Sequence, residues 1–484
     1  MATLAENATA VKLAQVAIDA AIVTKGGTTG GGLGNAAKAI INLPAGLARK
    51  DINFYGHREG LVYSYSKEEV LADGWDVPFV PTADGLTANG WNASRDRIRS
   101  IASSVGFCDV DAMYYPSDSG THVFLEITSV VNRAQKLRIG LGRIPGASST
   151  APVSIDIDWG DGTTHYTYDA PFSLTDITHT YATVGNYEIK ILTNDAGSLI
   201  VGGDTSNKYN LLGGKYSNDG GTTGRTSVVK HVVMSPTATV GAYAFNNLIG
   251  LRSLVLPSND CFADYLCAGD FALQGVSYSL DYSSSQIISI GRYTFHKCSA
   301  LGHFSFADML SKIGQHAFDS CSSLQSVTIE GNGVLVFDVG DNAFVACTSL
   351  KRVAAPSFGK NMFLNDLAIE EVVVNSVSAY SGEGVGMSAF SGCYGISEVR
   401  YNAGVGSNFF LADQSFLNCW SLRRHDFSRV LSVPKLNNRG AFFAGSSPLA
   451  EMEIVVPEDL YVAWTTSTNW SDSTIKPHII TAGD

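Results

Sequence analysis

Phenylalanine recurs at nearly regular intervals through the second half of the chain, and this recurrence restricts the possible folds more than any other feature. The recurring residues are Phe245, Phe271, Phe295, Phe318, Phe344, Phe363, Phe390, Phe416 and Phe442, roughly 19 to 27 residues apart. A unit of this length cannot bury its own apolar edge, so neighbouring units must stack on one another. We therefore predict a solenoid in which the strands of successive units pair and each phenylalanine packs on the next.

Other residue types repeat at fixed positions around each phenylalanine. An apolar residue usually stands five positions earlier, glycine often follows it, and leucine or isoleucine usually stands six positions after the phenylalanine. Cysteine stands three positions after it in five units, at Cys298, Cys321, Cys347, Cys393 and Cys419. Because five of the eight cysteines share one repeat position, we interpret them as small buried apolar residues rather than as disulfide partners.

The repeated unit resembles a known family. The segment Ile313-Gly-Gln-His-Ala-Phe318-Asp-Ser-Cys321-Ser-Ser-Leu324 is similar to the BspA-type leucine-rich repeat, and nine such units cover about residues 235–457. The units at Phe271 and Phe363 lack the cysteine, so we expect local irregularity there. The resemblance implies adhesion and ligand binding, and it assigns no catalytic residue.

The first residues of the chain show a helical pattern. Leu4, Asn7, Val11, Ala14, Ile18 and Ala21 form the a/d seam of a heptad repeat, which is apolar except for Asn7. The helix is expected to end at Gly26, where a glycine-rich hinge begins. The seam predicts a short parallel coiled coil that docks and oligomerises the protein, as a trimer. The alternative is a single helix packed on its own domain.

Between this helix and the repeats, the pattern changes to short strands. We expect a small α+β module, in which Ser66 and Glu69 form a capping box and strands near 113–115 and 123–127 pair. Alternating strands then indicate a β-sandwich. We predict that residues 1–45 form the N-terminal helical segment with its hinge, residues 46–130 the α+β module and residues 131–205 the β-sandwich. A linker at residues 206–230 then leads to the solenoid at residues 231–457 and the cap at residues 458–484. The fold class is therefore mostly β and multidomain.

Two further resemblances concern this N-terminal half. The run Asp156-Ile-Asp158-Trp159-Gly160-Asp161-Gly162, followed by His179-Thr-Tyr181, looks like a PKD-type domain, in which the WGDG turn is usually structural and binds no metal. Residues 51–92, with Gly85-Leu86-Thr87 and Gly90-Trp91-Asn92, resemble a module of virion proteins from phages of gut bacteria. The N-terminal helix and hinge also fit those phage proteins, which implies a virion location.

Composition and motifs exclude several functions. The chain has 45 acidic and 33 basic residues, a net charge of −12, which argues against a nucleic-acid-binding surface. The sequence contains no run of about 18 apolar residues, which a membrane-spanning helix would need. The N-terminus lacks the basic and apolar segments of a signal peptide. Neither a nucleophile elbow nor a zinc, phosphate-loop or paired-cysteine motif occurs. We predict no enzyme, no cofactor and no metal.

One local feature indicates ligand binding. Most units place serine or threonine directly after the cysteine, but two adjacent units place Tyr394 and Trp420 there, near Arg423 and Arg424. Flat rings beside hydrogen-bond donors suit stacking on sugars. The alternative is that the rings cover a turn or contact another subunit.

Together these observations predict a non-enzymatic phage virion protein, a tail or head fibre, that binds other virion proteins through its N-terminus and a host glycan or protein through its solenoid. A bacterial cell-surface adhesin of the internalin or BspA type is the first alternative. A tailspike-like glycan depolymerase is the second, because paired carboxylates can be distant in sequence.

Overall fold

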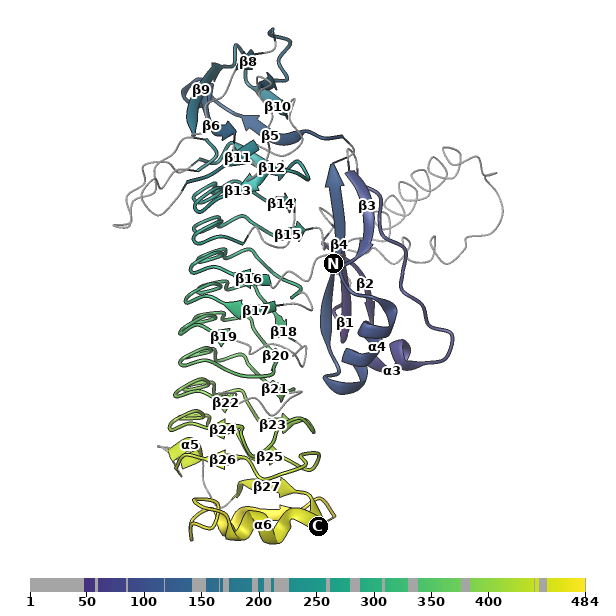
Figure 1. Ribbon diagram of the computed structural model, residues 1–484, viewed down its shortest axis with the longest axis vertical. Helices are drawn as coiled ribbons and strands as arrows, with labels where there is room; N and C mark the ends of the chain where they lie inside the picture. The colour runs from purple at the N-terminus through teal and green to yellow at the C-terminus, as the bar shows by residue number, and fades with distance from the viewer. Residues whose placement is uncertain are drawn as a thin grey trace, which may run out of the picture.

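The structure is a computed structural model that describes residues 48–483, apart from gaps at 57–59, 84–85, 117, 142–153, 165, 169–173, 194–198, 204–209, 213–225, 258–261, 279–287, 307–309, 330–337, 376–383, 439 and 444–450. The predicted coiled-coil seam from Leu4 to Ala21 and most of the predicted linker lie outside the described residues. The rest is mostly β, with a long solenoid, a β-sandwich at one end and a small module along one flank (Figure 1).

The module combines one sheet with two short helices. Its elements are β1 (Ile52–Gly56), β2 (Gly60–Tyr65), α3 (Lys67–Leu71), β3 (Leu86–Trp91), α4 (Arg95–Ser104) and β4 (Cys108–Pro116), with strand order β2-β1-β4-β3. Helix α3 begins at the predicted capping box, in which Ser66 and Glu69 each bond the other's backbone amide. Helix α4 buries Ile98 and Ile101 against the sheet.

The sandwich shares its sheets with the solenoid. Its elements are β5 (Thr121–Ile127), η1 (Val130–Asn132), β6 (Ala134–Leu141), β7 (Ile155–Asp158), β8 (Tyr166–Tyr168), β9 (Thr175–Thr180), β10 (Gly185–Thr193) and β11 (Leu199–Val201). Strand β5 was expected to pair inside the module, but it pairs with β10 and with β12 (Val229–Val233), the first solenoid strand. Strand β11 likewise pairs with β13 (Thr239–Val240). The sandwich therefore covers the first coil of the solenoid.

Most coils of the solenoid contribute one strand to each of two faces, which we call the larger sheet and the smaller sheet. The strands of each face are hydrogen-bonded in separate groups rather than as one continuous sheet. The larger-sheet strands are β12, β14 (Ser253–Leu256), β15 (Gly275–Tyr278), β18 (Ser326–Thr328), β20 (Arg352–Ala355), β21 (Glu371–Val374), β23 (Glu398–Tyr401), β25 (Arg424–Asp426), β27 (Glu453–Val456) and β28 (Ile479–Thr481). The smaller-sheet strands are β13, β16 (Ile288–Ile290), β17 (Leu310–Ile313), β19 (Asp338–Val339), β22 (Gly384–Val385), β24 (Phe410–Leu411) and β26 (Lys435–Leu436). Neighbouring solenoid strands run parallel.

A row of phenylalanine rings fills the centre of the stack. Phe295, Phe318, Phe344, Phe363, Phe390 and Phe416 are buried, and successive ring centroids lie 4.9–5.4 Å apart. Phe245 is also fully buried. The backbone at Phe442 continues the pattern, because the amide of Phe416 bonds the carbonyl of Ala441.

Phe271 does not lie in this row, contrary to the sequence-based assignment. Its side chain is 38% exposed, and the row position in that coil belongs to the fully buried Cys267. The Cys267 amide bonds the carbonyl of Thr294, as the Phe295 amide bonds that of Ala317. A small thiol thus takes the place of one ring, and Phe271 lies four residues further along.

The cysteines pack in a second row next to the rings. The Sγ atom of Cys321 donates to the carbonyl of Phe295 at 3.2 Å, and Cys347, Cys393 and Cys419 repeat this bond to the preceding coil. The seven cysteines in the described part of the chain are buried, and none of them is in a disulfide. Burial raises their pKa where a shift is resolved, as for Cys419 to about 12. They therefore act as core residues.

Two coils place a carboxylate in the cysteine row. Asp270 and Asp366 are fully buried, and within the described residues neither carboxylate makes a hydrogen bond of good geometry. Burial raises the pKa of both groups well above the ordinary value. Backbone amides still lie close enough to lower the pKa in part, that of Leu248 at Asp270 and those of Cys347 and Ala346 at Asp366. These are the two coils whose missing cysteine the sequence had marked as irregular.

The turn around each ring uses an unusual backbone conformation. From the coil of Phe245 to the coil of Phe416, two residues four positions apart have positive φ, and most are not glycine: examples are Asn342 (φ 59°) and Ala346 (φ 62°). This conformation costs an L-residue about 1–2 kcal/mol. It is retained because turn amides then bond carbonyls of the next coil, as when Ser320 N bonds Val345 O at 2.8 Å.

The far end of the stack has its own cover. The elements after β26 are α5 (Gly440–Phe443), η3 (Glu458–Leu460), α6 (Tyr461–Thr466) and η4 (Lys476–His478), and α6 lies across the end of the solenoid (Figure 1). Trp464 and Trp470 are buried with ring centroids 4.4 Å apart. Their rings close the core that the last coil would otherwise expose.

The module is docked on the larger sheet through a buried polar cluster. Asp111 accepts from the amide of Ser305 at 3.0 Å and lies 3.1 Å from His303 Nε2. The ring of His303 stacks on Tyr55 with centroids 3.6 Å apart. Nearby, Ser326 of the solenoid donates to Asp109. These contacts tie segments about 200 residues apart in the chain.

The positive-φ turns give a stability prediction. Ala346→Gly should raise the free energy of unfolding by about 0.5–1 kcal/mol, because relief of the strain exceeds the entropic cost of glycine. Ala343→Gly, in the same turn without positive φ, should lower it. Thermal denaturation followed by circular dichroism checks both; destabilisation by Ala346→Gly would contradict the strain.

The buried carboxylates give a pH-dependent prediction. Because burial raises the pKa of Asp366, the folded state binds more protons than the unfolded state above about pH 4, and its stability should fall as pH rises from there. Asp366→Cys should stabilise by about 1–3 kcal/mol through removal of an unpaired polar group, and by more at pH 7.5 than at pH 4.5. Asp366→Asn should also flatten the pH dependence. A pH-independent difference between wild type and both variants would contradict burial of a titrating group.

Candidate functional site

The position four residues after each ring forms a row at one corner of the stack, where the turn leads back to the larger sheet. We call these residues the corner row: Ile249, Phe271, Ser299, Ser322, Thr348, Leu367, Tyr394 and Trp420. In the three middle coils the row is polar. In the last three it consists of Leu367, Tyr394 and Trp420, whose side chains are 53%, 45% and 51% exposed.

These last three residues, the apolar corner, belong to coils that are directly hydrogen-bonded. The amide of Asn365 bonds the carbonyl of Ser391, and that of Gly392 bonds Leu417, at 2.9 and 2.7 Å. Coils bonded in this way lie about 4.8 Å apart. The side chains of Leu367, Tyr394 and Trp420 therefore start from neighbouring points and present one continuous apolar strip to solvent.

The two arginines predicted beside the rings are both engaged in the fold. Arg423 donates to the backbone carbonyl of Trp420 at 2.8 Å and to Glu451 at 2.9 Å, so its guanidinium lies beside the turn that carries Trp420. Arg424 begins β25 and pairs with Glu398 at 3.1 Å and Glu453 at 2.9 Å on the adjacent strands. The structure thus places Arg423 on the backbone of the Trp420 turn and Arg424 in an ion-pair network along the larger sheet.

Sequence reasoning missed Leu367 because it searched for aromatic rings rather than for the repeat position. The signal was present: leucine stands four residues after Phe363, where other coils have serine or threonine. Phe271 stands four residues after Cys267 and so also belongs to the corner row. This assignment requires knowing that Cys267, rather than Phe271, occupies the ring position of that coil.

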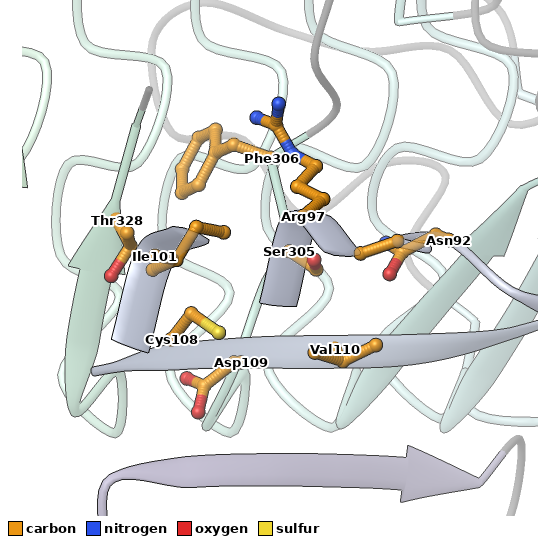
Figure 2. A pocket seen from close by; sticks show the side chains of 10 residues that line it. Asn92, Arg97, Ile101, Cys108, Asp109, Val110, Ser305, Phe306 and Thr328 are labelled. Carbon is orange, nitrogen blue, oxygen red and sulfur yellow. The ribbon is translucent and has the colours of Figure 1, made fainter. Parts of the chain in front are cut away.

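One pocket between the module and the solenoid is too small to hold a ligand larger than water. Figure 2 shows this pocket, lined by Cys108 and Asp109 of the module and by Ser305, Phe306 and Thr328 of the solenoid. Its volume is about 20 Å³, which is room for one water molecule.

The described residues offer neither a metal site nor a membrane-spanning element. The WGDG aspartates bond their own turn: Asp158 accepts from the amide of Gly160 at 2.8 Å, and Asp161 from that of Thr163 at 3.1 Å. No group of three or more histidine, cysteine or acidic side chains is arranged to hold a metal ion in the part of the chain that the structure describes. Across the same residues, no helix has the length and apolarity needed to cross a bilayer.

Known proteins match the solenoid. The family model described as a BspA type leucine rich repeat region matches six copies at residues 225–351 and 277–393. A leucine-rich repeat protein of T. pallidum is similar at 21% identity and a TM-score of 0.28, covering 42% of this chain and 83% of that one. A leucine-rich repeat protein from Bacteroides ovatus ATCC 8483 is similar at 16% identity and a TM-score of 0.28, covering 51% and 76%.

No curated protein matches the chain. The family match covers the coils in which the rings, the cysteine row and the positive-φ turns repeat. The turns and strands continue in the same pattern beyond residue 393 to the C-terminal cap. The C-terminal half of this protein is therefore a solenoid of BspA-type leucine-rich repeats.

Proposed function

We propose that this protein is a non-enzymatic recognition protein that attaches to a bacterial cell surface through the apolar corner. The observation that carries the proposal is the change of the corner row from Ser299, Ser322 and Thr348 to Leu367, Tyr394 and Trp420. Burial of apolar surface contributes about 25 cal/mol of favourable free energy per Å², and three large apolar side chains in water do not gain it. A strip of this kind is typical of an interaction surface.

The composition of the apolar corner favours a protein partner over a sugar. Tryptophan and tyrosine dominate the binding energy of protein interfaces. Sugar stacking was predicted on two rings flanked by free donors, but the neighbouring coil carries the aliphatic Leu367, and Arg423 and Arg424 already bond carboxylates. A glycan at the same strip remains an outcome that the experiment distinguishes.

We further propose that the protein acts in a phage virion, as a head or tail fibre. Support comes from the resemblance of residues 51–92 and of the N-terminal helix and hinge to such proteins. A bacterial surface adhesin of the internalin or BspA type uses the same solenoid and is the main alternative. Peptide mass spectrometry of purified phage particles and of washed cell envelopes decides between them.

The apolar corner predicts the effect of exposed substitutions. The triple variant Leu367→Ser/Tyr394→Ser/Trp420→Ser should lose at least about tenfold in affinity for cells of a gut-bacterial strain that binds the wild-type protein, because each truncated contact costs about 1 kcal/mol or more. Leu431→Ser, at a residue that is 77% exposed outside the corner row, is the matched control and should bind normally.

Treatment of the cells identifies the partner class in the same assay. Protease treatment should abolish binding, whereas periodate oxidation of sugars should leave it intact. The opposite result assigns the strip to a glycan and overturns the protein partner. Equal binding by the triple variant and the wild type overturns the site itself.

The predicted seam makes the oligomeric state testable. In light scattering the full chain should have about three times the monomer mass of 51.4 kDa, because an apolar a/d seam associates helices. Val11→Asp/Ile18→Asp should yield monomer, whereas Val16→Asp, off the seam, should not. A wild-type protein that stays monomeric at high concentration refutes the seam.

A further inference from the structure

A separate depression lies on the opposite side of the turns from the corner row. Its volume is about 390 Å³, and it is lined by Asp264, Ser289, Ile290, Gly291, Arg292, Lys312, Gly314, Gln315, Asp338 and Gly340. These residues come from successive coils at and around β16, β17 and β19. At about 4.8 Å per coil, the depression extends about 14 Å along the stack.

The floor of the depression is backbone. Gly291, Gly314 and Gly340 follow the inward-facing residues of three successive strands. A Cβ on Gly314 would lie 2.5 Å from the carbonyl carbon of Gly291, and one on Gly340 would lie 2.3 Å from the amide nitrogen of Gln315. The close contact between these coils therefore requires glycine.

The rim carries charges of both signs in equal number. Arg292 bonds Asp264 through its backbone amide at 2.7 Å and through its guanidinium at 3.1 and 3.2 Å. Lys312 lies 3.1 Å from Asp338. The side chains of Arg292, Lys312 and Asp338 are 55–60% exposed. The two pairs hold donors and acceptors in place on both sides of a groove whose four rim charges sum to zero.

This arrangement selects a ligand by charge. An anion in the groove would be attracted by Arg292 and Lys312 but repelled by Asp264 and Asp338, and a cation would experience the reverse. For either ion the favourable and unfavourable electrostatic energies therefore offset each other. A polyol has neither penalty, because each hydroxyl both donates and accepts and can bond carboxylates, cations, Gln315 and the exposed backbone. An extended chain of sugars also matches a groove about three coil spacings long.

We propose that this depression, the neutral groove, binds a segment of a neutral oligosaccharide. The neutral groove and the apolar corner share no residue: the groove is lined by residues 264–340, and the corner lies at residues 367–420. The solenoid thus carries two recognition surfaces of different chemistry, a polar one for sugar and an apolar one for protein.

The test uses the full chain and purified sugars in isothermal titration calorimetry. The probes are the neutral hexasaccharides of cellulose, α-mannan and α-glucan, the anionic hexagalacturonate and the cationic chitosan hexamer. At least one neutral probe should bind, and Lys312→Ala/Asp338→Ala should weaken it at least about tenfold through loss of hydrogen bonds to both groups. Both positions are exposed, so the variant keeps the fold.

Two controls separate this proposal from the function proposed above. Lys351→Ala/Glu370→Ala removes an equally exposed ion pair away from the groove, with side chains 61% and 66% exposed, and should leave the sugar affinity within twofold. The triple variant of the apolar corner should also bind the sugar normally while losing cell attachment. Absence of binding to every neutral probe, preference for a charged probe, or full affinity in Lys312→Ala/Asp338→Ala overturns the neutral groove.

Discussion

The structure depends on backbone hydrogen bonds that pass from the turn of one coil to the turn of the next. In the turn around Phe318, amides bond the carbonyls of Asp341, Ala343 and Val345 on the following coil. A turn satisfies only some of its polar groups internally, as when the amide of Cys321 bonds the carbonyl of Phe318, so each coil is incomplete without its neighbour. The rings can then stack about 5 Å apart because the backbone has already set that spacing.

The same constraint explains the two ends. A stack of parallel strands leaves open edges that attract other chains unless they are covered. At the first coil the cover is the sandwich, whose strands β5 and β11 pair with β12 and β13. At the last coil it is β28 and helix α6, with Trp464 and Trp470 over the core. The sandwich is therefore part of the same hydrophobic core as the solenoid.

Because the rings, cysteines and glycines are used for stacking, recognition is left to positions that the stack does not constrain. The corner row is one such position, and its side chains vary from serine to tryptophan between coils. The outward residues Lys312 and Asp338 on the smaller sheet are another. The larger sheet is less available, since the module covers Ala354 and Val373 on its outer face. The proposed recognition surfaces accordingly lie on the two sides of the turns.

The sequence by itself determined the solenoid and its ring and cysteine rows, because each depends on local spacing that the coils repeat. It located Tyr394 and Trp420 for the same reason. It also placed the C-terminal cap, where the repeat pattern stops. Only the tertiary structure decided the register at Cys267 and Phe271, where two plausible positions differ by four residues and inter-coil bonds choose between them. Only the tertiary structure also showed which strands pair with β5 and that Asp111 of the module contacts His303 of the solenoid. Such contacts join residues far apart in the chain, and no local pattern encodes which distant surface is complementary.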